Sequence, residues 1–287
     1  MPDLAPLLSL FGLLPFDCLQ ARFMQQAMLG LVLLAPMAAV MGVQVVNMRM
    51  AFFSDAISHS AFAGVAIGLI FSIDPDISMP VFGILVGLAI VGTLRRTSLS
   101  SDTVIGVIFS AVMAFGLAVV SRHNTIARDL QQFLYGDILT ISQNELWCLL
   151  AIFVVLVLFQ LVGYNRLLYV SLDPVLARAH RVRVALYQYC FAALLALVVM
   201  FSVRAVGVLL VTAMLIVPAA SARNLAGSSG SMFWWSLLVG LSSAMCGLIL
   251  SAQEWVGTTS GAVIILISCL WFLVSLGVSA IRGDRVR

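Results

Sequence analysis

Long apolar runs separated by short polar segments fill this chain from about residue 26 onward. Each run approaches the ~20 residues that a helix needs to cross the hydrocarbon core of a membrane. Because that core contains no water, the backbone polar groups of a spanning segment must be satisfied within a helix. The pattern therefore predicts an all-α, polytopic bundle of about eight or nine transmembrane helices. The expected spans are 26–46, 49–72, 79–94, 104–121, 146–163, 185–203, 205–220, 232–251 and 261–281.

Composition supports a membrane protein and excludes a large soluble domain. Of the 287 residues, 62% are hydrophobic and 9% are charged, whereas roughly 25% of residues in a soluble domain are charged. The first 25 residues lack the basic stretch that opens a signal peptide, so we expect an interfacial segment there. Residues 26–287 are then expected to form a single transmembrane domain. No GxxxxGK[ST] loop is present in the sequence, so ATP-driven work would belong to another chain.

Arginine placement indicates the orientation in the membrane. All 15 basic residues are arginines, and cytoplasmic loops are enriched in basic residues. With nine spans, of which 185–203 and 205–220 are separated only by Arg204, a cytoplasmic C-terminus satisfies this rule. The cytoplasmic arginines would be Arg49, Arg95, Arg96, Arg166, Arg178, Arg181, Arg183, Arg223, Arg282, Arg285 and Arg287, and the outer ones Arg22, Arg122, Arg128 and Arg204.

One expected span contains an aspartate and a histidine one helical turn apart. In MRMAFFSDAISHSAFAGVAIGLIF, residues 48–71, Asp55 and His59 are i and i+4 and project from one helix face. If the helix begins near Met48, Asp55 lies roughly 10 Å along its axis. An ionised aspartate at the centre of a membrane helix costs ~2.5–3.5 kcal/mol, so the chain must compensate this charge.

The chemistry of the pair suits a divalent transition metal. A carboxylate and an imidazole are ligands for Zn²⁺, Mn²⁺ or Fe²⁺. Ser60, Gly64 and Gly68 form a small-xxx-small ridge on a neighbouring face, which would allow another helix to approach closely. Two alternatives remain at this point: an Asp–His ion pair that only ties two turns together, or a helix that begins later and leaves both residues in water.

Four sequence blocks in order resemble the integral-membrane permeases of zinc, manganese and iron ABC importers. The first is MRMAFFSDAISHSAFAGVAIG. The others are SSDTVIGVIFSAVMAFGLAVVS, DLQQFLYGDILTIS, and SLDPVLARAHRV followed by VRAVGVLLVTAMLIVPAASARNLA. The resemblance extends over nearly the whole chain from about residue 22. It implies a fold similar to the type II ABC importers in the bacterial cytoplasmic membrane.

The resemblance also implies a function and partners. The chain would be the permease subunit of an importer for a divalent cation, with zinc favoured and manganese or iron next. It would have no permanently bound cofactor and no enzymatic activity of its own, and would work by alternating access. The partners would be cytoplasmic ATPase subunits, an extracytoplasmic metal-binding protein, a second copy of the permease and membrane lipid, but no nucleic acid. Asp55 and His59 match the family's ion-contacting positions, and Asn47 is a further candidate ligand.

A loop at about 166–184 matches the family's ATPase-coupling segment. Asp173 suits a helix N-cap and Pro174 a first helical turn. Family members usually have glycine where this chain has Arg181, and proline where it has Ala63. The coupling residues expected by this match are Asp173, Pro174, Leu176, Ala177, Arg178, Ala179 and Arg181.

Rival interpretations differ in cargo or mechanism. A related ABC permease for siderophores or cobalamin would pass a bulky chelate and gain little from the Asp–His pair. A cation carrier independent of an ATPase is a further alternative. An intramembrane enzyme would use Ser54 or Ser58 with His59, although such residues on adjacent turns are poorly oriented for proton transfer. Asp102 is expected to cap a helix, and the loop residues His123, Asp129 and Asp137 are expected to be interfacial or solvated rather than ligands.

Overall fold

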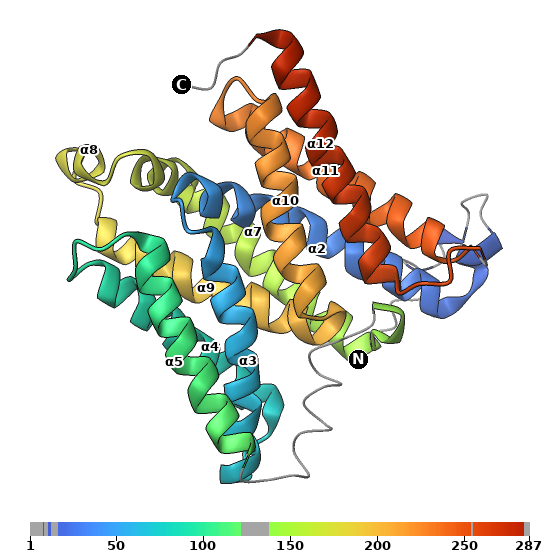
Figure 1. The fold of residues 1–287 in the computed structure, drawn as a ribbon, viewed down its shortest axis with the longest axis horizontal. Coiled ribbons are helices and arrows are strands. Elements are labelled where there is room, and N and C mark those ends of the chain that lie inside the picture. Colours follow the sequence, from blue (N-terminus) through green and yellow to red (C-terminus); the bar gives the residue numbers. More distant parts are fainter. Residues whose placement is uncertain (1–7, 9–10, 13–16, 122–137, 254, 284–287) are drawn as a thin grey trace. The chain divides into compact units, whose positions relative to one another are not determined.

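The computed structural model describes residues 8, 11–12, 17–121, 138–253 and 255–283 (Figure 1). Within these residues all regular secondary structure is helical, which confirms the all-α prediction. A 3-10 turn, η1 (Asp17–Gln20), precedes the first long helix. The long helices are α2 (Arg22–Asn47), α3 (Ala51–Phe71), α4 (Pro75–Leu94), α5 (Ser101–Val120), α7 (Gln143–Leu172), α9 (Val184–Val206), α10 (Val208–Leu225), α11 (Ser229–Ser251) and α12 (Ser260–Arg282), with η2 (Ile138–Thr140) before α7 and α8 (Pro174–Ala179) before α9.

Eight of these helices are long and apolar enough to cross a membrane, as far as the described residues show. The exception among the long helices is α3, whose first half contains Ser54, Asp55, Ser58, His59 and Ser60. It links two spanning helices, α2 and α4. Its polar residues therefore have to be accommodated by packing and by internal hydrogen bonds.

The chain forms two compact units. Unit 1 comprises Met1–Val43, Gly136–Phe153 and Ala205–Arg287, and unit 2 comprises Gln44–Tyr135 and Val154–Arg204. In unit 1, α10, α11 and α12 pack against one another. Gly247 of α11 makes this possible, because a Cβ there would lie 2.6 Å from Cα of Ile264 on α12.

Unit 2 is built around α3, which packs against both α4 and α5 (Figure 1). Gly64 and Gly68 of the small-residue ridge face α4, which confirms that another helix approaches closely there. A Cβ on Gly64 would lie 2.9 Å from Cα of Met79, and one on Gly68 would lie 3.0 Å from the carbonyl oxygen of Ile73. Close approach of this kind lets helices gain van der Waals contact where no hydrophobic effect drives association.

The two ends of unit 2 differ in charge and contacts. At one end Asp74 caps α4 by accepting a hydrogen bond from the Asp76 amide, and Asp76 forms an ion pair with Arg204 of α9. At the other end Arg95 donates to Oε1 of Gln188 at 3.0 Å. Arg166 likewise donates to the Tyr187 hydroxyl at 2.8 Å. Basic residues that the orientation rule assigns to the cytoplasm thus tie α4 and α7 to the first turns of α9.

Several helix boundaries differ from those expected. The helix α4 begins at Pro75 rather than 79, and α7 spans 30 residues instead of ending near 163. The break between α9 and α10 is at Gly207, which has a φ of 87°, and not at Arg204. Glycine adopts positive φ at little cost, so the chain can turn there, whereas Arg204 lies within the last turn of α9.

Three described non-glycine residues adopt left-handed backbone conformations, and each lies at a helix end: Arg49 (φ 54°), Ser72 (φ 54°) and Arg181 (φ 58°). After α8, the Val182 amide donates to the Ala177 carbonyl at 3.0 Å and the Arg181 amide donates to the Arg178 carbonyl at 3.0 Å. This is a Schellman motif, in which glycine is the usual left-handed residue. The preference for glycine at position 181 in the resembled family therefore has a conformational cause.

Gly64→Ala should destabilise the protein. The added methyl group would press on the backbone of α4 at Met79, and overpacking of this kind costs ~1–3 kcal/mol. We expect a lower unfolding temperature for purified protein in detergent. The matched control is Gly106→Ala on α5, where a Cβ meets nothing within 4 Å and stability should not fall. Equal unfolding temperatures for the Gly64 variant and wild type would contradict the close contact of α3 and α4.

Arg181→Gly should stabilise the end of α8. A left-handed conformation costs an L-residue ~1–2 kcal/mol, and glycine would remove this cost. Part of the gain is lost because glycine also increases the conformational entropy of the unfolded chain. The net gain should slow amide hydrogen exchange in residues 174–184 about two- to fivefold, measured by mass spectrometry. Arg183→Gly is the control, because Arg183 is not among the described positive-φ residues. Unchanged or faster exchange in the Arg181 variant would be evidence against strain at this position.

Candidate functional site

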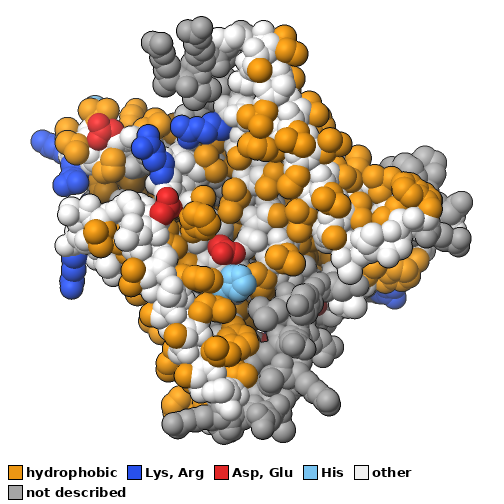
Figure 2. All heavy atoms as spheres, in the orientation of Figure 1, with side chains coloured by type: hydrophobic (Ala, Val, Ile, Leu, Met, Phe, Trp, Pro, Cys, Tyr) orange, Lys and Arg blue, Asp and Glu red, His pale blue; other side chains and the backbone are white. Residues whose placement is uncertain are grey.

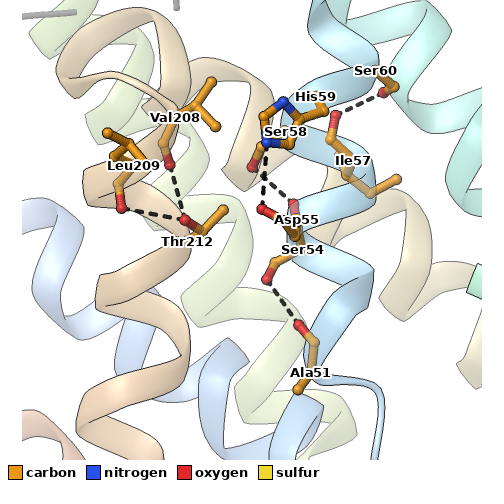
Figure 3. A network of polar contacts seen from close by, with 10 residues as sticks. All are labelled: Ala51, Ser54, Asp55, Ile57, Ser58, His59, Ser60, Val208, Leu209 and Thr212. Atoms are coloured by element: carbon orange, nitrogen blue, oxygen red, sulfur yellow. Dashed lines mark hydrogen bonds and ion pairs between the residues drawn. The ribbon is translucent and has the colours of Figure 1, made fainter. Parts of the chain in front are cut away.

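Asp55 and His59 lie on the same side of α3 and face each other (Figure 3). Nε2 of His59 is 3.6 Å from Oδ1 of Asp55, and the side chains are 32% and 39% exposed, respectively. Figure 2 shows an acidic side chain in contact with a histidine on a face that is otherwise mostly hydrophobic. The spacing in the sequence thus places the two groups as expected, with their polar atoms accessible.

The pair lies closer to the start of its helix than the sequence suggested. The expected span is 49–72 and the expected depth of Asp55 assumes a helix start near Met48, whereas α3 begins at Ala51. At ~1.5 Å per residue, Asp55 is then about 6 Å along the axis and His59 about 12 Å. The residues between α2 and α3 form a turn and are not part of α3. In this turn the Met50 amide donates to the Val45 carbonyl at 3.0 Å, and Arg49 adopts a left-handed conformation.

The serines beside the pair are satisfied within α3 itself. The Ser58 hydroxyl donates to the Ser54 carbonyl at 2.8 Å, and the Ser60 hydroxyl donates to the Ile57 carbonyl at 2.7 Å. Ser54, Ser58 and Ser60 are fully buried. Back-bonding of this kind lets a serine sit in an apolar helix without an unpaired donor. The hydroxyl of Ser58 is therefore not aligned with the imidazole as a serine–histidine nucleophile would require.

An aromatic ring from another helix contacts the imidazole. Phe109 of α5 has its ring centroid 5.5 Å from that of His59, with an angle of 73° between the ring planes, in an edge-to-face arrangement. Sequence reasoning missed this residue, although it lies inside the second quoted block. No local signal could have found it, because the contact depends on how α3 and α5 pack.

Asn47, the third candidate ligand, is the last residue of α2. Its Nδ2 is buried without a hydrogen-bond partner, and no hydrogen bond or ion pair joins it to Asp55 or His59 among the described residues. The described part of the chain also contains no group of three or more His, Cys, Asp or Glu side chains placed to hold a metal ion. The structure thus places Asp55 and His59 together, and no described hydrogen bond or ion pair adds Asn47 to them.

The expected coupling segment contains a short, capped helix. Oδ1 of Asp173 accepts hydrogen bonds from the amides of Val175 at 2.7 Å and Leu176 at 3.1 Å, and Pro174 occupies the first turn of α8. The predicted cap and first turn are confirmed. Ala177 is buried in a small cluster with Val170 and Val184.

The opposite face of α8 is open. Val175 is 71% exposed, and Leu172 and Leu176 are exposed beside it. Basic side chains gather around the part of the surface that α8 occupies (Figure 2). The His180 ring, just after α8, stacks on Tyr169 of α7 with 5.9 Å between the ring centroids. The segment therefore presents apolar side chains flanked by arginines.

The remaining candidates give mixed outcomes. Asp102 does not cap α5, because the cap is Ser100, whose hydroxyl accepts from the Thr103 amide at 3.3 Å. Asp102 instead lies in the first turn of α5, where its negative charge interacts favourably with the helix dipole. The loop residues His123, Asp129 and Asp137 lie outside the described residues.

Comparison with known proteins gives matches along most of the chain. Residues 20–279 match the ABC 3 transport family. The chain is 33% identical to the high-affinity zinc uptake system membrane protein ZnuB of Haemophilus influenzae, over 87% of this chain and 95% of that protein. It is also 33% identical to the manganese import system permease protein ScaB of Streptococcus parasanguinis, over 89% of this chain and 90% of that protein.

A solved structure has the same fold. PsaBC from Streptococcus pneumoniae in complex with Fab matches with a TM-score of 0.75 and 29% identity, over 95% of each chain. Together with the apolar helices, these matches identify a multi-pass protein of the bacterial cytoplasmic membrane. The resemblance to permeases of metal-type ABC importers is confirmed, and the chain belongs to the ABC 3 transport family.

Proposed function

We propose that this chain imports a divalent transition-metal cation by alternating access, with ATP hydrolysed on separate partner subunits. The observation that supports this most directly is the Asp55–His59 pair on α3. Two relatives are named for zinc and manganese transport. Zinc is the preferred cargo and manganese or iron the next, since the YGDIL block at residues 135–139 is more similar to zinc permeases.

The spacing of the pair fits a shared ion. Two ligands of a tetrahedral Zn²⁺ ion, each at about 2.0–2.2 Å, are about 3.3–3.6 Å apart. The observed separation of 3.6 Å is at the upper end of this range, so a small rotation of either side chain would let both bind. Two donors on one helix bind an ion less tightly than the four of a closed structural site. A weak site suits transport because the ion has to leave.

Asn47 is the proposed third ligand. Its Nδ2 is buried without a hydrogen-bond partner among the described residues, so no hydrogen bond at Nδ2 opposes a rotation of the carboxamide toward an ion. A carboxamide oxygen is a weak, neutral metal ligand that adds no charge to the membrane interior. With Asp55 and His59 it would complete a set of one anionic and two neutral donors.

The α8 segment is the proposed contact with the ATPase. Its exposed Val175 and Leu176 would bind a groove on the partner, and Arg178 would contribute charge. The Asp173 cap stabilises the first turn of α8, and the buried Ala177 packs against Val170 of α7 and Val184 of α9, so a displacement of α8 would move these helices. The further proposed coupling residues are Pro174, Ala179 and Arg181, and an extracytoplasmic metal-binding protein and a second permease chain are the other proposed partners.

The rival functions are less well supported. An enzyme based on Ser58 and His59 is disfavoured because the Ser58 hydroxyl donates to a backbone carbonyl. A pathway for siderophores or cobalamin would not need a carboxylate and imidazole on α3. Co-purification of an ATPase subunit with the tagged chain separates an ABC permease from an ATPase-independent carrier.

Asp55→Ala and His59→Ala should each lower metal uptake by roughly ten- to a hundredfold, because each removes one of two anchoring donors. The measurement is the initial rate of uptake of radiolabelled zinc and manganese in bacteria that lack the native permease. Asp102→Asn is the control, since Asp102 lies in the first turn of α5 and outside the pair. Wild-type rates in both site variants would remove the pair from the ion's route.

Asp173→Ala should weaken coupling without changing the ion site. Loss of the two cap hydrogen bonds costs about 1 kcal/mol of helix stability, and metal-stimulated ATP hydrolysis by the reconstituted transporter should fall two- to fivefold, an estimate from that cost. Asp173→Asn provides the control, because asparagine caps helices about as well as aspartate. If the alanine and asparagine variants hydrolyse ATP equally fast, the cap has no part in coupling.

A further inference from the structure

We infer that Phe109 is a positioning residue for the ion site, because its ring fixes the orientation of the His59 imidazole. The inference rests on the proposed function of Asp55 and His59 as ion ligands. Phe109 itself has no donor atom and would not bind the ion. Its role would be to hold one ligand in the geometry that the ion needs.

Among the described residues, no hydrogen bond of ordinary length holds the His59 ring. Its Nε2 is 3.6 Å from the Asp55 carboxylate, which exceeds the 2.7–3.2 Å usual for such a bond. No other hydrogen bond to the imidazole occurs among the described residues. Histidines that bind metals are normally oriented by a carboxylate, carbonyl or water on the second ring nitrogen. Since the described part of the protein supplies no such partner, another contact has to orient the ring.

Phe109 supplies that contact. The torsion about the Cβ–Cγ bond of histidine is soft and has broad minima, so a free imidazole would sample many ring angles. Edge-to-face packing at a centroid distance of 5.5 Å and an interplanar angle of 73° favours one of them. In that orientation Nε2 faces Asp55 on the same side of α3 (Figure 3).

Packing between the helices keeps Phe109 in place. On the same pair of helices, a Cβ on Gly116 of α5 would lie 2.7 Å from the Phe62 ring of α3. The two helices therefore also contact each other closely beyond the His59–Phe109 level, toward their C-terminal ends. The His59–Phe109 contact consequently belongs to the packed interface between α3 and α5.

The test measures metal binding by the purified permease–ATPase complex in lipid nanodiscs, without the extracytoplasmic binding protein. Zn²⁺ gives the Kd, and the visible absorption of bound Co²⁺ reports the ligand set. Phe109→Leu keeps an apolar side chain but removes the ring, and should raise the Zn²⁺ Kd roughly three- to tenfold. Phe109→Tyr restores a ring and should bind like wild type. Phe115→Leu is the matched control, since Phe115 is an exposed phenylalanine on the same helix.

A double-mutant cycle separates positioning from general packing. In a His59→Gln background, which keeps a donor but has no ring, Phe109→Leu should change the Kd by less than about twofold. The same factor in both backgrounds, or a wild-type Kd for Phe109→Leu, would overturn the inference. If the leucine variant does not accumulate in membranes, Phe109→Met replaces it in every arm.

The two proposals can fail separately. If His59→Ala binds Zn²⁺ with the wild-type Kd and gives the wild-type Co²⁺ spectrum, the ion site itself is wrong. If His59→Ala weakens binding while Phe109→Leu does not, only the positioning role is wrong. Weakened binding in both, with rescue by tyrosine, supports both.

Discussion

The rest of unit 2 is arranged around a carboxylate and an imidazole on α3, the helix that links the spanning helices α2 and α4. An ionised aspartate deep in a bilayer costs ~2.5–3.5 kcal/mol, and the cost falls toward the interface. Asp55 lies about 6 Å from the start of α3, toward the end of unit 2 where Arg95 and Arg166 contact α9. It is closer to the start of its helix than a start at Met48 would place it, and His59 lies 3.6 Å away.

The polar side chains on the remaining faces of α3 are satisfied by contacts within the helix and buried, whereas this pair is partly exposed. The serine hydroxyls bond to carbonyls of their own helix, and the glycine ridge allows α4 to pack closely. The Phe109 ring closes on the imidazole from α5. These contacts leave the carboxylate and the imidazole as the polar groups of α3 that could meet an ion. Selectivity and release would then depend on two donors and on whatever neighbouring helices add.

The α8 segment meets a different physical requirement, because the coupling role proposed for it needs a rigid helix. A six-residue helix is too short to be stable alone, so its ends have to be fixed. Asp173 fixes the first turn, and the Schellman motif around Arg181 fixes the last. Arginine in a left-handed conformation stores a small strain where glycine would not. Nothing in the structure explains why this chain has arginine there.

The sequence by itself determined the features that depend on residues within one or two helical turns of each other. The apolar runs predicted the spanning helices, the i, i+4 spacing predicted the Asp–His pair, and Asp173–Pro174 predicted the cap of α8. Helix ends were harder. The sequence put a helix start near Met48, a break at Arg204 and a cap at Asp102, whereas the structure has Ala51, Gly207 and Ser100. An apolar run does not specify which backbone carbonyls a turn will satisfy.

Only the tertiary structure placed Phe109 against His59 and the Met79 backbone against Gly64. These partners are far apart in the chain, and many phenylalanines and glycines would have fitted the same apolar pattern equally well. Which of them meet is decided by the rotation and direction of each helix against its neighbours. That choice follows from the close packing of many side chains at once, which local spacing does not encode.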